Sequence, residues 1–274
     1  MTEKVWLITG TSRGFGRVWA QAALERGDKV IATARDVKTL APLVDRHAER
    51  VAAIALDVND RAAVFKAVAE AHKRFGRLDV VINNAGYGLF GAIEEISEAN
   101  ARAQIETNLF GALWVTQAAL PIMRAQGSGH VIQVSSIGGV SAFPGVGLYH
   151  ASKWGLEAFS QSLSLEVADF GINVTLVEPQ GYSTDWSGPS SIRADQMDAY
   201  EGMREARKKQ LGARKVGDPD ASGPAILKLV DAEKPPLRCF LGATAFDIVR
   251  PDYESRIANW EEWDWLAKEA HGDE

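Results

Sequence analysis

Two side chains that can exchange protons, Tyr149 and Lys153, lie four residues apart. On a helix this spacing places them on one face, although such a pair alone arises by chance in roughly one sequence in five. Ser136 follows an apolar run thirteen residues before the tyrosine, residues 83–86 follow an earlier apolar run, and Asn108 lies in a long helical stretch. All but Asn108 fall at the carboxyl ends of expected parallel strands, where open α/β sheets bind ligands.

A glycine-rich turn joins the first apolar run to the first helical stretch. Gly10 permits a tight turn, Gly14 lets the backbone approach a pyrophosphate, and Gly16 lets helix and strand pack closely. The helix N-terminus then offers free N–H groups to phosphates. The spacing differs from the commoner G-x-G-x-x-G, so an ordinary turn between strand and helix is the alternative interpretation.

The end of the second expected strand indicates which dinucleotide is bound. Arg35 falls at the strand end and Arg13 projects from the glycine turn, and two guanidinium groups near one ribose favour a 2′-phosphate, hence NADP(H). Asp36 supports the alternative, because an acid at this point would bind the ribose 2′-hydroxyl of NAD.

Short apolar runs alternate with longer helical patterns, which predicts parallel βαβ units. Continuously apolar strands indicate a sheet covered on both faces. We expect an α/β fold of the Rossmann type, with a doubly wound, seven-stranded parallel sheet and helices on both faces. One domain, 1–274, is expected to carry a substrate-flap insertion at about 187–217. The expected strands span 5–8, 29–34, 51–56, 79–82, 130–134, 172–177 and 238–241. The expected helices span 14–26, 60–75, 97–126, 149–170 and 219–232, with a Trp-rich helix last.

Composition and net charge limit the kinds of partner that the chain is expected to bind. With 30 basic and 36 acidic residues, the net charge is −6, and the absence of a long basic run argues against nucleic acid. No uncharged apolar run reaches 18 residues, so no membrane partner is expected. The N-terminal residues do not resemble a signal peptide, and the single cysteine, Cys239, cannot form an internal disulfide. We therefore expect a cytoplasmic protein, and no metal, because no His, Cys or acidic cluster has ligand spacing.

In combination, these motifs resemble the short-chain dehydrogenase/reductase family, in its short single-domain branch. The resemblance covers residues 5–186 and rests on the glycine turn, Asp57-Val58, residues 83–86, Asn108, Ser136, Tyr149-x-x-x-Lys153 and residues 179–184. One departure is the insertion of Gln180 between Pro179 and Gly181, where the family usually has Pro-Gly. The far end is similar to bacterial carbonyl reductases related to hydroxysteroid dehydrogenases.

The resemblance implies a catalytic set of four residues. Tyr149 would be the acid/base at the substrate oxygen, assisted by Lys153, whose charge would lower the phenol pKa from near ~10. Ser136 would hydrogen-bond the substrate oxygen, and Asn108 would hold a water that links Lys153 to solvent. Thr184 would hold the nicotinamide carboxamide, although it could simply cap a helix. The residues expected to bind the cofactor are Gly10, Ser12, Arg13, Gly14, Phe15, Gly16, Arg35, Asp57, Val58, Asn84, Ala85, Gly86, Tyr149, Lys153, Pro179, Gly181 and Thr184.

The substrate walls are expected from residues 87–93, residues 140–148 and the flap, and they are mostly apolar. They favour a small apolar carbonyl or alcohol substrate. Met197, Tyr200 and Met203 could line this site or merely pack the flap, and His150 is expected to be structural. The resemblance implies that the helices at 98–126 and 149–170 pair across a two-fold axis, and their broad apolar faces agree with a homodimer or homotetramer. The Trp260 and Trp263 side chains share a helix face and are expected to pack against the protein; the alternative is a partner site. The leading function is an NADP(H)-dependent ketone reductase or alcohol dehydrogenase. The alternatives are an NAD-linked alcohol dehydrogenase and a catalytically idle dinucleotide-binding regulator.

Overall fold

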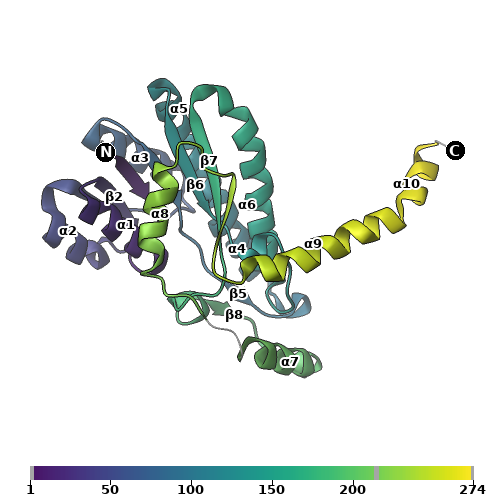
Figure 1. Cartoon of the computed structure of the whole chain (residues 1–274). Coiled ribbons are helices and arrows are strands. Elements are labelled where there is room, and N and C mark those ends of the chain that lie inside the picture. The colour runs from purple at the N-terminus through teal and green to yellow at the C-terminus, as the bar shows by residue number, and fades with distance from the viewer. Residues whose placement is uncertain (1–2, 213–215, 273–274) are drawn as a thin grey trace.

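A single parallel sheet of seven strands forms the centre of the computed structural model, which describes residues 3–212 and 216–272 (Figure 1). Its order is β3-β2-β1-β4-β6-β7-β9, so the predicted doubly wound α/β fold is confirmed. Residues 213–215 of the expected flap and the two ends of the expected domain lie outside the described residues. The strands are β1 (Val5–Ile8), β2 (Lys29–Ala34), β3 (Val51–Ala55), β4 (Val80–Asn83), β6 (Gly129–Val134), β7 (Ile172–Pro179) and β9 (Arg238–Leu241).

Helices cover both faces of the sheet, and each face has its own apolar core. One face carries α1 (Gly14–Arg26), α2 (Ala41–His47) and α8 (Ser222–Asp231). The other carries α3 (Arg61–Phe75), α5 (Gly111–Gln126) and α6 (Gly147–Glu166). Trp19 of α1 and Met123 of α5 are fully buried on opposite faces. The strand order reverses between β1 and β4, and such a switch point opens a crevice at the carboxyl ends of the strands.

Several helix and strand boundaries differ from the sequence prediction. The predicted helix 149–170 is α6, which begins two residues earlier and ends at Glu166, because the chain turns back at Gly171 with a φ of 68°. The helix predicted from 219 begins at Ser222, after a turn in which Ser222 N donates to Pro219 O. The strand predicted to end at 177 continues to Pro179, since β9 pairs with it up to Leu241.

The long helix predicted over 97–126 is present but interrupted. Ser97 caps its first part, α4 (Glu98–Ile105), and accepts a hydrogen bond from Asn100 N at 3.2 Å. A π-helical turn at Glu106–Phe110 then leads into α5. Such turns place one extra residue in the helix and are frequent at functional sites.

A small two-stranded sheet and a helix form the flap over the carboxyl end of the main sheet. β5 (Leu89–Phe90) pairs with β8 (Ile192–Arg193), and α7 (Glu201–Gly212) follows. Glu95 anchors this region, because its carboxylate accepts hydrogen bonds from Ala92 N at 2.7 Å, Met197 N at 2.8 Å and Arg204 Nη1 at 2.6 Å. These contacts tie the flap to the body through one side chain.

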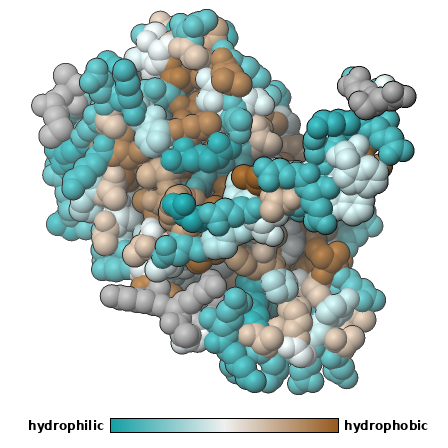
Figure 2. Space-filling view, turned by 45° about the vertical axis from the view of Figure 1, so that its right-hand side comes forward, coloured by the Kyte–Doolittle hydropathy of each residue, from teal (hydrophilic) through white to brown (hydrophobic). Residues whose placement is uncertain are grey.

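The C-terminal helices α9 (Ala245–Glu262) and α10 (Asp264–His271) lead away from the body (Figure 1). In Figure 2 the surface on the right-hand side, where these helices lie, is mostly hydrophilic or intermediate in hydropathy. The prediction that the tryptophans pack inward is wrong, since Trp260 and Trp263 are 68% and 51% exposed. The physical reason is that α9 points outward after Val249, its last buried residue. Within the described part of the chain, no helix combines the length and apolarity needed to cross a membrane.

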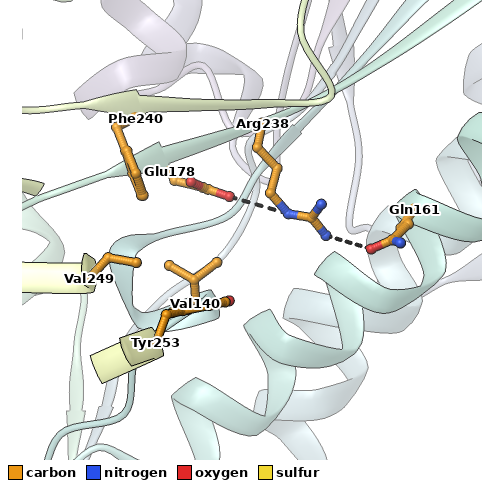
Figure 3. A pocket seen from close by; sticks show the side chains of 7 residues that line it. All are labelled: Val140, Gln161, Glu178, Arg238, Phe240, Val249 and Tyr253. Carbon is orange, nitrogen blue, oxygen red and sulfur yellow. Dashed lines mark hydrogen bonds and ion pairs between the residues drawn. The ribbon is translucent and has the colours of Figure 1, made fainter. Parts of the chain in front are cut away.

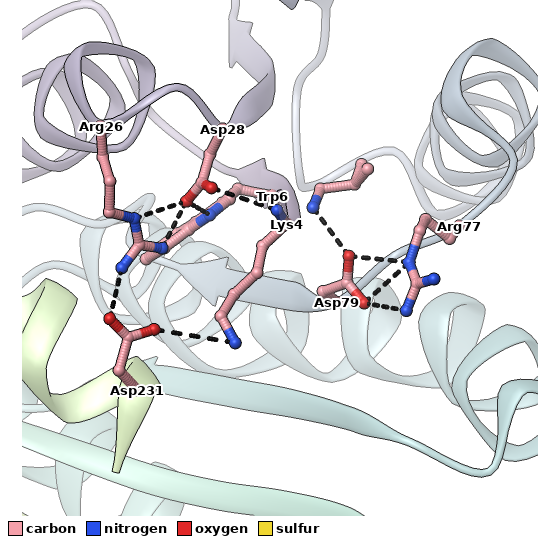
Figure 4. A network of polar contacts seen from close by, with 8 residues as sticks. Lys4, Trp6, Arg26, Asp28, Arg77, Asp79 and Asp231 are labelled. Carbon is pink, nitrogen blue, oxygen red and sulfur yellow. Dashed lines mark hydrogen bonds and ion pairs between the residues drawn. The ribbon is translucent and has the colours of Figure 1, made fainter. Parts of the chain in front are cut away.

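Charged side chains at the amino ends of the strands pair with one another (Figure 4). Asp28, which is 3% exposed, accepts hydrogen bonds from the Trp6 indole at 2.8 Å, from Lys4 N at 3.1 Å and from the Arg26 guanidinium. Asp79 accepts one from Val5 N at 2.8 Å and pairs with a neighbouring arginine. These carboxylates fix where β1 begins.

Candidate active site

A cavity of about 890 Å³ opens at the carboxyl ends of the strands. It is lined by nearly all the residues predicted from the sequence, and only Gly16 and Asn108 of that set do not line it. The predicted residues that do are Gly10, Ser12, Arg13, Gly14, Phe15, Arg35, Asp57, Val58, Asn84, Ala85, Gly86, Ser136, Tyr149, Lys153, Pro179, Gly181 and Thr184. Predicted residues as far apart in the chain as Gly10 and Thr184 therefore meet in one cavity.

The glycine turn has the backbone that its spacing predicts. Gly10 and Gly14 have φ angles of 68° and 57°, in the region that favours glycine. A Cβ on Gly16 would lie 2.5 Å from Gly10 O and from the Asn84 side chain, so this glycine permits close packing instead of lining the cavity. Asn84 Nδ2 donates to Thr9 O at 2.9 Å and to Gly10 O at 3.0 Å, which ties the turn to β4.

The N-terminus of α1 faces this cavity without a competing negative group. The residue before the helix, Arg13, makes no side-chain cap, and the first helical turn holds no acidic residue. A Cβ on Gly14 would meet nothing within 4 Å. Free N–H groups and the positive end of the helix dipole thus remain available to a phosphate, and the site fits a dinucleotide.

The two arginines predicted to meet a 2′-phosphate both line the cavity. Arg13 and Arg35 are exposed, and within residues 3–212 and 216–272 their guanidinium groups make no ion pair. Asp36 is engaged elsewhere, because its carboxylate accepts a hydrogen bond from Lys38 N at 3.0 Å and caps the next turn. It does not line the cavity.

The segment after β3 forms another part of the cavity wall. Asp57 and Val58 line the cavity, and the Asp57 carboxylate accepts a hydrogen bond from Asn59 N at 3.0 Å. Val58 is buried against Gly111, where a Cβ would lie 2.7 Å from its Cγ2. The wall at this point is therefore fixed by α5.

Tyr149, Ser136 and Lys153 come together on one side of the cavity. Ser136 Oγ accepts a hydrogen bond from Gly138 N at 3.0 Å and hydrogen-bonds the Tyr149 hydroxyl. The Lys153 Nζ lies 5.9 Å from the centre of the tyrosine ring and donates to Val134 O at 2.7 Å. The tyrosine and lysine are 6% exposed each. The arrangement places a phenol and an ammonium group side by side in a low-dielectric environment.

Burial changes the proton affinity of this pair. It raises the pKa of Tyr149 to about 12, against a smaller lowering by the Ser136 hydrogen bond, and it lowers the pKa of Lys153 to about 8. The expectation that Lys153 lowers the tyrosine pKa is therefore wrong for the protein alone, since desolvation of the phenolate outweighs the other influences. Near neutral pH Tyr149 is a neutral phenol and can donate a proton.

Asn108 lies in the π-helical turn behind the cavity. Its Oδ1 accepts from Tyr87 N at 3.1 Å, and its Nδ2 donates to Tyr87 O at 3.0 Å and to Ser152 Oγ at 3.2 Å. Both ends of the amide are thus occupied by the strand-to-helix segment after β4 and by α6. The side chain joins the two segments that carry Gly86 and Lys153.

The unusual Gln180 between Pro179 and Gly181 is held by the end of β9. Gln180 Nε2 donates to Thr244 Oγ1 at 2.6 Å, and Thr244 N donates back to Gln180 Oε1 at 3.1 Å. The turn therefore keeps both Pro179 and Gly181 at the cavity. Thr184 also lines it, and its hydroxyl caps the short turn that follows by accepting from Trp186 N at 3.4 Å.

Aromatic and aliphatic side chains form the remaining wall. The Trp186 ring lies 4.9 Å from the Tyr149 ring and 5.2 Å from Phe90, centre to centre. The other apolar lining residues of this wall are Phe143, Pro144, Val146, Pro189, Ile192 and Ile248.

The far end of the cavity decides between the two interpretations of the flap residues and locates His150. Met197, Tyr200 and Met203 do not line the cavity, and Tyr200 donates to Glu94 Oε2 at 2.6 Å, so they hold the flap. His150 does line it, although its Nδ1 lies 3.1 Å from Ser141 O as expected of a structural residue. Burial lowers its pKa to about 4, so the ring is neutral at neutral pH.

Sequence reasoning missed the residues of α7 that line the cavity, Arg207 and Gln210. They lie four and seven positions after Met203, and no sequence signal distinguished them from other surface polar groups. Within the described ranges, no group of three or more His, Cys, Asp or Glu side chains could hold a metal ion.

A doubly wound sheet with a glycine turn at its switch point defines a nucleotide-binding α/β protein. Residues 4–194 match the family described as short chain dehydrogenase. The chain therefore belongs to the short-chain dehydrogenase/reductase family, as its motifs predicted, and it is an oxidoreductase of that family.

Relatives match nearly the whole chain. It is 43% identical to Oxidoreductase BOA17 of Botryotinia fuckeliana, over 95% of this chain and 96% of the relative. It is 36% identical to 3-ketodihydrosphingosine reductase of Bacteroides thetaiotaomicron, over 88% of this chain and 89% of the relative.

Solved structures share the fold. The crystal structure of a short-chain dehydrogenase from Streptomyces avermitilis superposes with a TM-score of 0.92 at 39% identity, and covers 98% of both chains. An alcohol dehydrogenase from Thermococcus sibiricus, complexed with 5-hydroxy-NADP, has a TM-score of 0.74 at 25% identity, over 88% of this chain and 96% of the other.

Proposed function

We propose that this chain is an NADP(H)-dependent oxidoreductase that interconverts a ketone and a secondary alcohol. The observation that carries the proposal is the meeting of Tyr149, Ser136 and Lys153 in the same cavity as an uncapped helix N-terminus. A dinucleotide-binding regulator would need no buried acid/base beside its cofactor, so this set argues against an idle protein.

NADP(H) is favoured over NAD by the charges at the end of β2. Arg13 and Arg35 line the cavity, whereas the Asp36 carboxylate caps a turn outside it. A 2′-phosphate carries about two negative charges near neutral pH and would accept charge-assisted hydrogen bonds from both guanidinium groups. A relative of the fold also binds an NADP derivative.

Ser136, Tyr149 and Lys153 have separate roles in the proposed ketone reduction. NADPH supplies the hydride when it is bound. Ser136 positions the carbonyl oxygen and Tyr149 donates its proton to that oxygen as negative charge develops. The high pKa of the tyrosine, about 12, keeps this proton in place at neutral pH. The Lys153 ammonium would stabilise the phenolate that remains and would hold the ribose of the bound cofactor. For the reverse reaction the same tyrosine must be deprotonated before it accepts the proton of the alcohol.

The substrate is an uncharged ketone with an apolar body. Phe90, Phe143 and Trp186 line the approach to Tyr149, and an apolar wall favours an apolar ligand. The named relative that reduces 3-ketodihydrosphingosine indicates that a long-chain ketone belongs among the candidates. The apolar faces of α5 and α6 are the proposed contacts of a homodimer or homotetramer.

The experiment is a panel of ketones with NADPH, followed by the loss of nicotinamide absorbance. We expect turnover with cyclic or long-chain apolar ketones and little with small keto acids. Consumption of NADH but not NADPH would contradict the cofactor assignment, and no turnover with any ketone or secondary alcohol would contradict the proposed reaction.

A further inference from the structure

A second cavity, of about 360 Å³, lies beside β7, β9 and α9 (Figure 3). Arg238 crosses it between Glu178 and Gln161, and donates to Gln161 Oε1 at 2.9 Å. Its walls are Val140, Gln161, Glu178, Arg238, Phe240, Val249 and Tyr253. None of these residues lines the larger cavity.

The α6 helix connects the two cavities. Tyr149, Lys153, Glu157 and Gln161 follow one another at intervals of four and therefore form one stripe along the helix. The first two line the larger cavity and Gln161 lines the smaller one. Glu157 lies between them and is 6% exposed.

Glu157 is one of two carboxyl groups buried together. Glu178 of β7 is 1% exposed, and the two side chains hydrogen-bond each other. The Arg238 Nε lies 2.9 Å from Glu157 Oε2 but 3.7 Å from Glu178 Oε1. Two adjacent buried carboxylates repel, so one of them retains a proton. The closer guanidinium makes Glu157 the ionised member and leaves the proton on Glu178.

Burial raises the pKa of both groups, and the charge of Glu157 helps to raise that of Glu178 to about 8. The same charge raises the pKa of Lys153 against the lowering by burial. The other titratable groups around the pair are Tyr149 on α6, Arg238 and Cys239 on β9, and Tyr253 on α9.

The space around the pair is tightly fixed. A Cβ on Gly139 would lie 3.2 Å from Glu157 Cγ and 3.3 Å from its Oε1, and would collide with Ser135 Oγ. Glycine at this position therefore admits the carboxylate beneath the end of β6. The Lys153 Nζ is bonded to the same strand through Val134 O.

We propose that Glu157 is a positioning residue: its carboxylate, held by Arg238 and by a proton on Glu178, keeps Lys153 in its ammonium form beneath the substrate. This inference rests on the proposed function for the role of the ammonium, but the charge coupling itself is a property of the protein alone. Glu178 serves as the neutral hydrogen-bond donor of the pair.

The test compares Glu157→Gln/Glu178→Gln with Glu178→Gln alone. The single variant keeps the Glu157 charge and replaces a neutral carboxyl by a neutral amide donor. The double variant removes the charge at nearly constant volume. Nitrogen-15 lysine NMR follows the Lys153 ammonium in the protein without cofactor, and Lys153→Met identifies its resonance.

We expect the Lys153 midpoint to fall by about one pH unit in the double variant and to stay at the wild-type value in Glu178→Gln. Where ketone reduction is measurable, the basic limb of its kcat/KM profile moves to lower pH by the same amount. Equal midpoints in the two variants overturn the proposal. A missing ketone reductase activity in the wild type contradicts the proposed function instead, because the NMR titration does not depend on turnover.

Thermal unfolding shows whether each variant is folded. If the double variant does not fold, Glu157→Gln/Glu178→Met is titrated, and Glu157→Asp/Glu178→Met is its control with the charge retained. A lower Lys153 midpoint in the glutamine variant, with recovery in the aspartate variant, supports the proposal. The same midpoint in both overturns it.

Discussion

Charged side chains at the two ends of the central sheet differ in whether they have ion-pair partners. At the amino ends of the strands, Asp28 and Asp79 are fully engaged with Arg26, Arg77 and backbone N–H groups. At the carboxyl ends, Arg13 and Arg35 make no ion pair within the part of the chain that the structure describes. Paired charges fix the strands, whereas unpaired charges beside a cavity remain available to a ligand. The comparison therefore separates residues that stabilise the fold from residues proposed to carry out the reaction.

The largest effect is expected at the carboxyl end. Tyr149→Phe removes only the hydroxyl, so turnover should fall about a hundredfold or more, while the ring still packs against Trp186. Steady-state rates and a fluorescence titration of NADPH measure the two properties. Turnover within about threefold of the wild type would remove Tyr149 from the proposed mechanism.

The second largest effect is expected at the amino ends of the strands, and it concerns the stability of the fold. Asp28→Ala leaves the buried Trp6 indole without its partner and leaves the Arg26 guanidinium with Asp231 alone. The loss should be about 2–3 kcal/mol in the free energy of unfolding.

For a chain of this length the midpoint of thermal unfolding should then fall by about 5–10 °C. Turnover at a temperature where the variant is folded should be unchanged. Asp45→Ala, an exposed aspartate on α2, is the control and should have little effect. A variant of Asp28 with normal stability but low activity would contradict the division between the two ends.

The third effect concerns cofactor choice. Arg35→Ala should weaken NADPH binding roughly ten- to hundredfold and leave NADH binding nearly unchanged, and Arg13→Ala should act in the same direction to a smaller degree. Dissociation constants at fixed ionic strength provide the test, with Lys38→Ala as a nearby exposed control. If Arg35→Ala weakens both cofactors equally, or if the wild type prefers NADH, the assignment of the 2′-phosphate is wrong and Asp36 becomes the residue to examine.

The smallest effect is expected at the flap. Glu95→Gln weakens the acceptor for Met197 N, Ala92 N and Arg204, so KM for the ketone should rise about three- to tenfold with kcat and NADPH affinity little changed. Glu94→Gln weakens only the exposed hydrogen bond from Tyr200 and should have a smaller effect.

Protonation of Glu95 should have the same consequence for KM as the Glu95→Gln substitution. Its hydrogen bonds, first of all that from Met197 N, hold the pKa of Glu95 below its usual range. The stabilising contact is therefore present above the ordinary pKa of a glutamate and is lost only as the pH falls through the lowered value. A KM that rises already near neutral pH would contradict this account of the flap.

The residues at the carboxyl ends of the strands could be predicted from the sequence better than those at the amino ends. Gly10, Gly14 and Tyr149-x-x-x-Lys153 are local patterns, and the alternation of strands and helices places them at one edge of a parallel sheet. The sequence could not show that Gly16 only permits packing, or that Asn108 lies in a π-helical turn behind the cavity, because both depend on contacts with distant segments.

Long-range contacts also explain what was missed. Glu157 and Glu178 come together only because α6 packs on β7, and neither has a motif of its own. The outward course of α9, which leaves Trp260 exposed, depends on where the last buried residue of the helix falls. Helical periodicity alone gives the face of a side chain but not whether anything covers that face.

The most direct test of the proposed function is the transfer of deuterium from labelled NADPH to a ketone. The wild-type protein is incubated with an apolar ketone and NADPH that carries deuterium at both hydrogens of the nicotinamide C4, and the alcohol is analysed by mass spectrometry and NMR. We predict one deuterium on the former carbonyl carbon and none on the hydroxyl after exchange with water, with product formation nearly lost in Tyr149→Phe. An alcohol without deuterium at that carbon, or equal product from the phenylalanine variant, would contradict it.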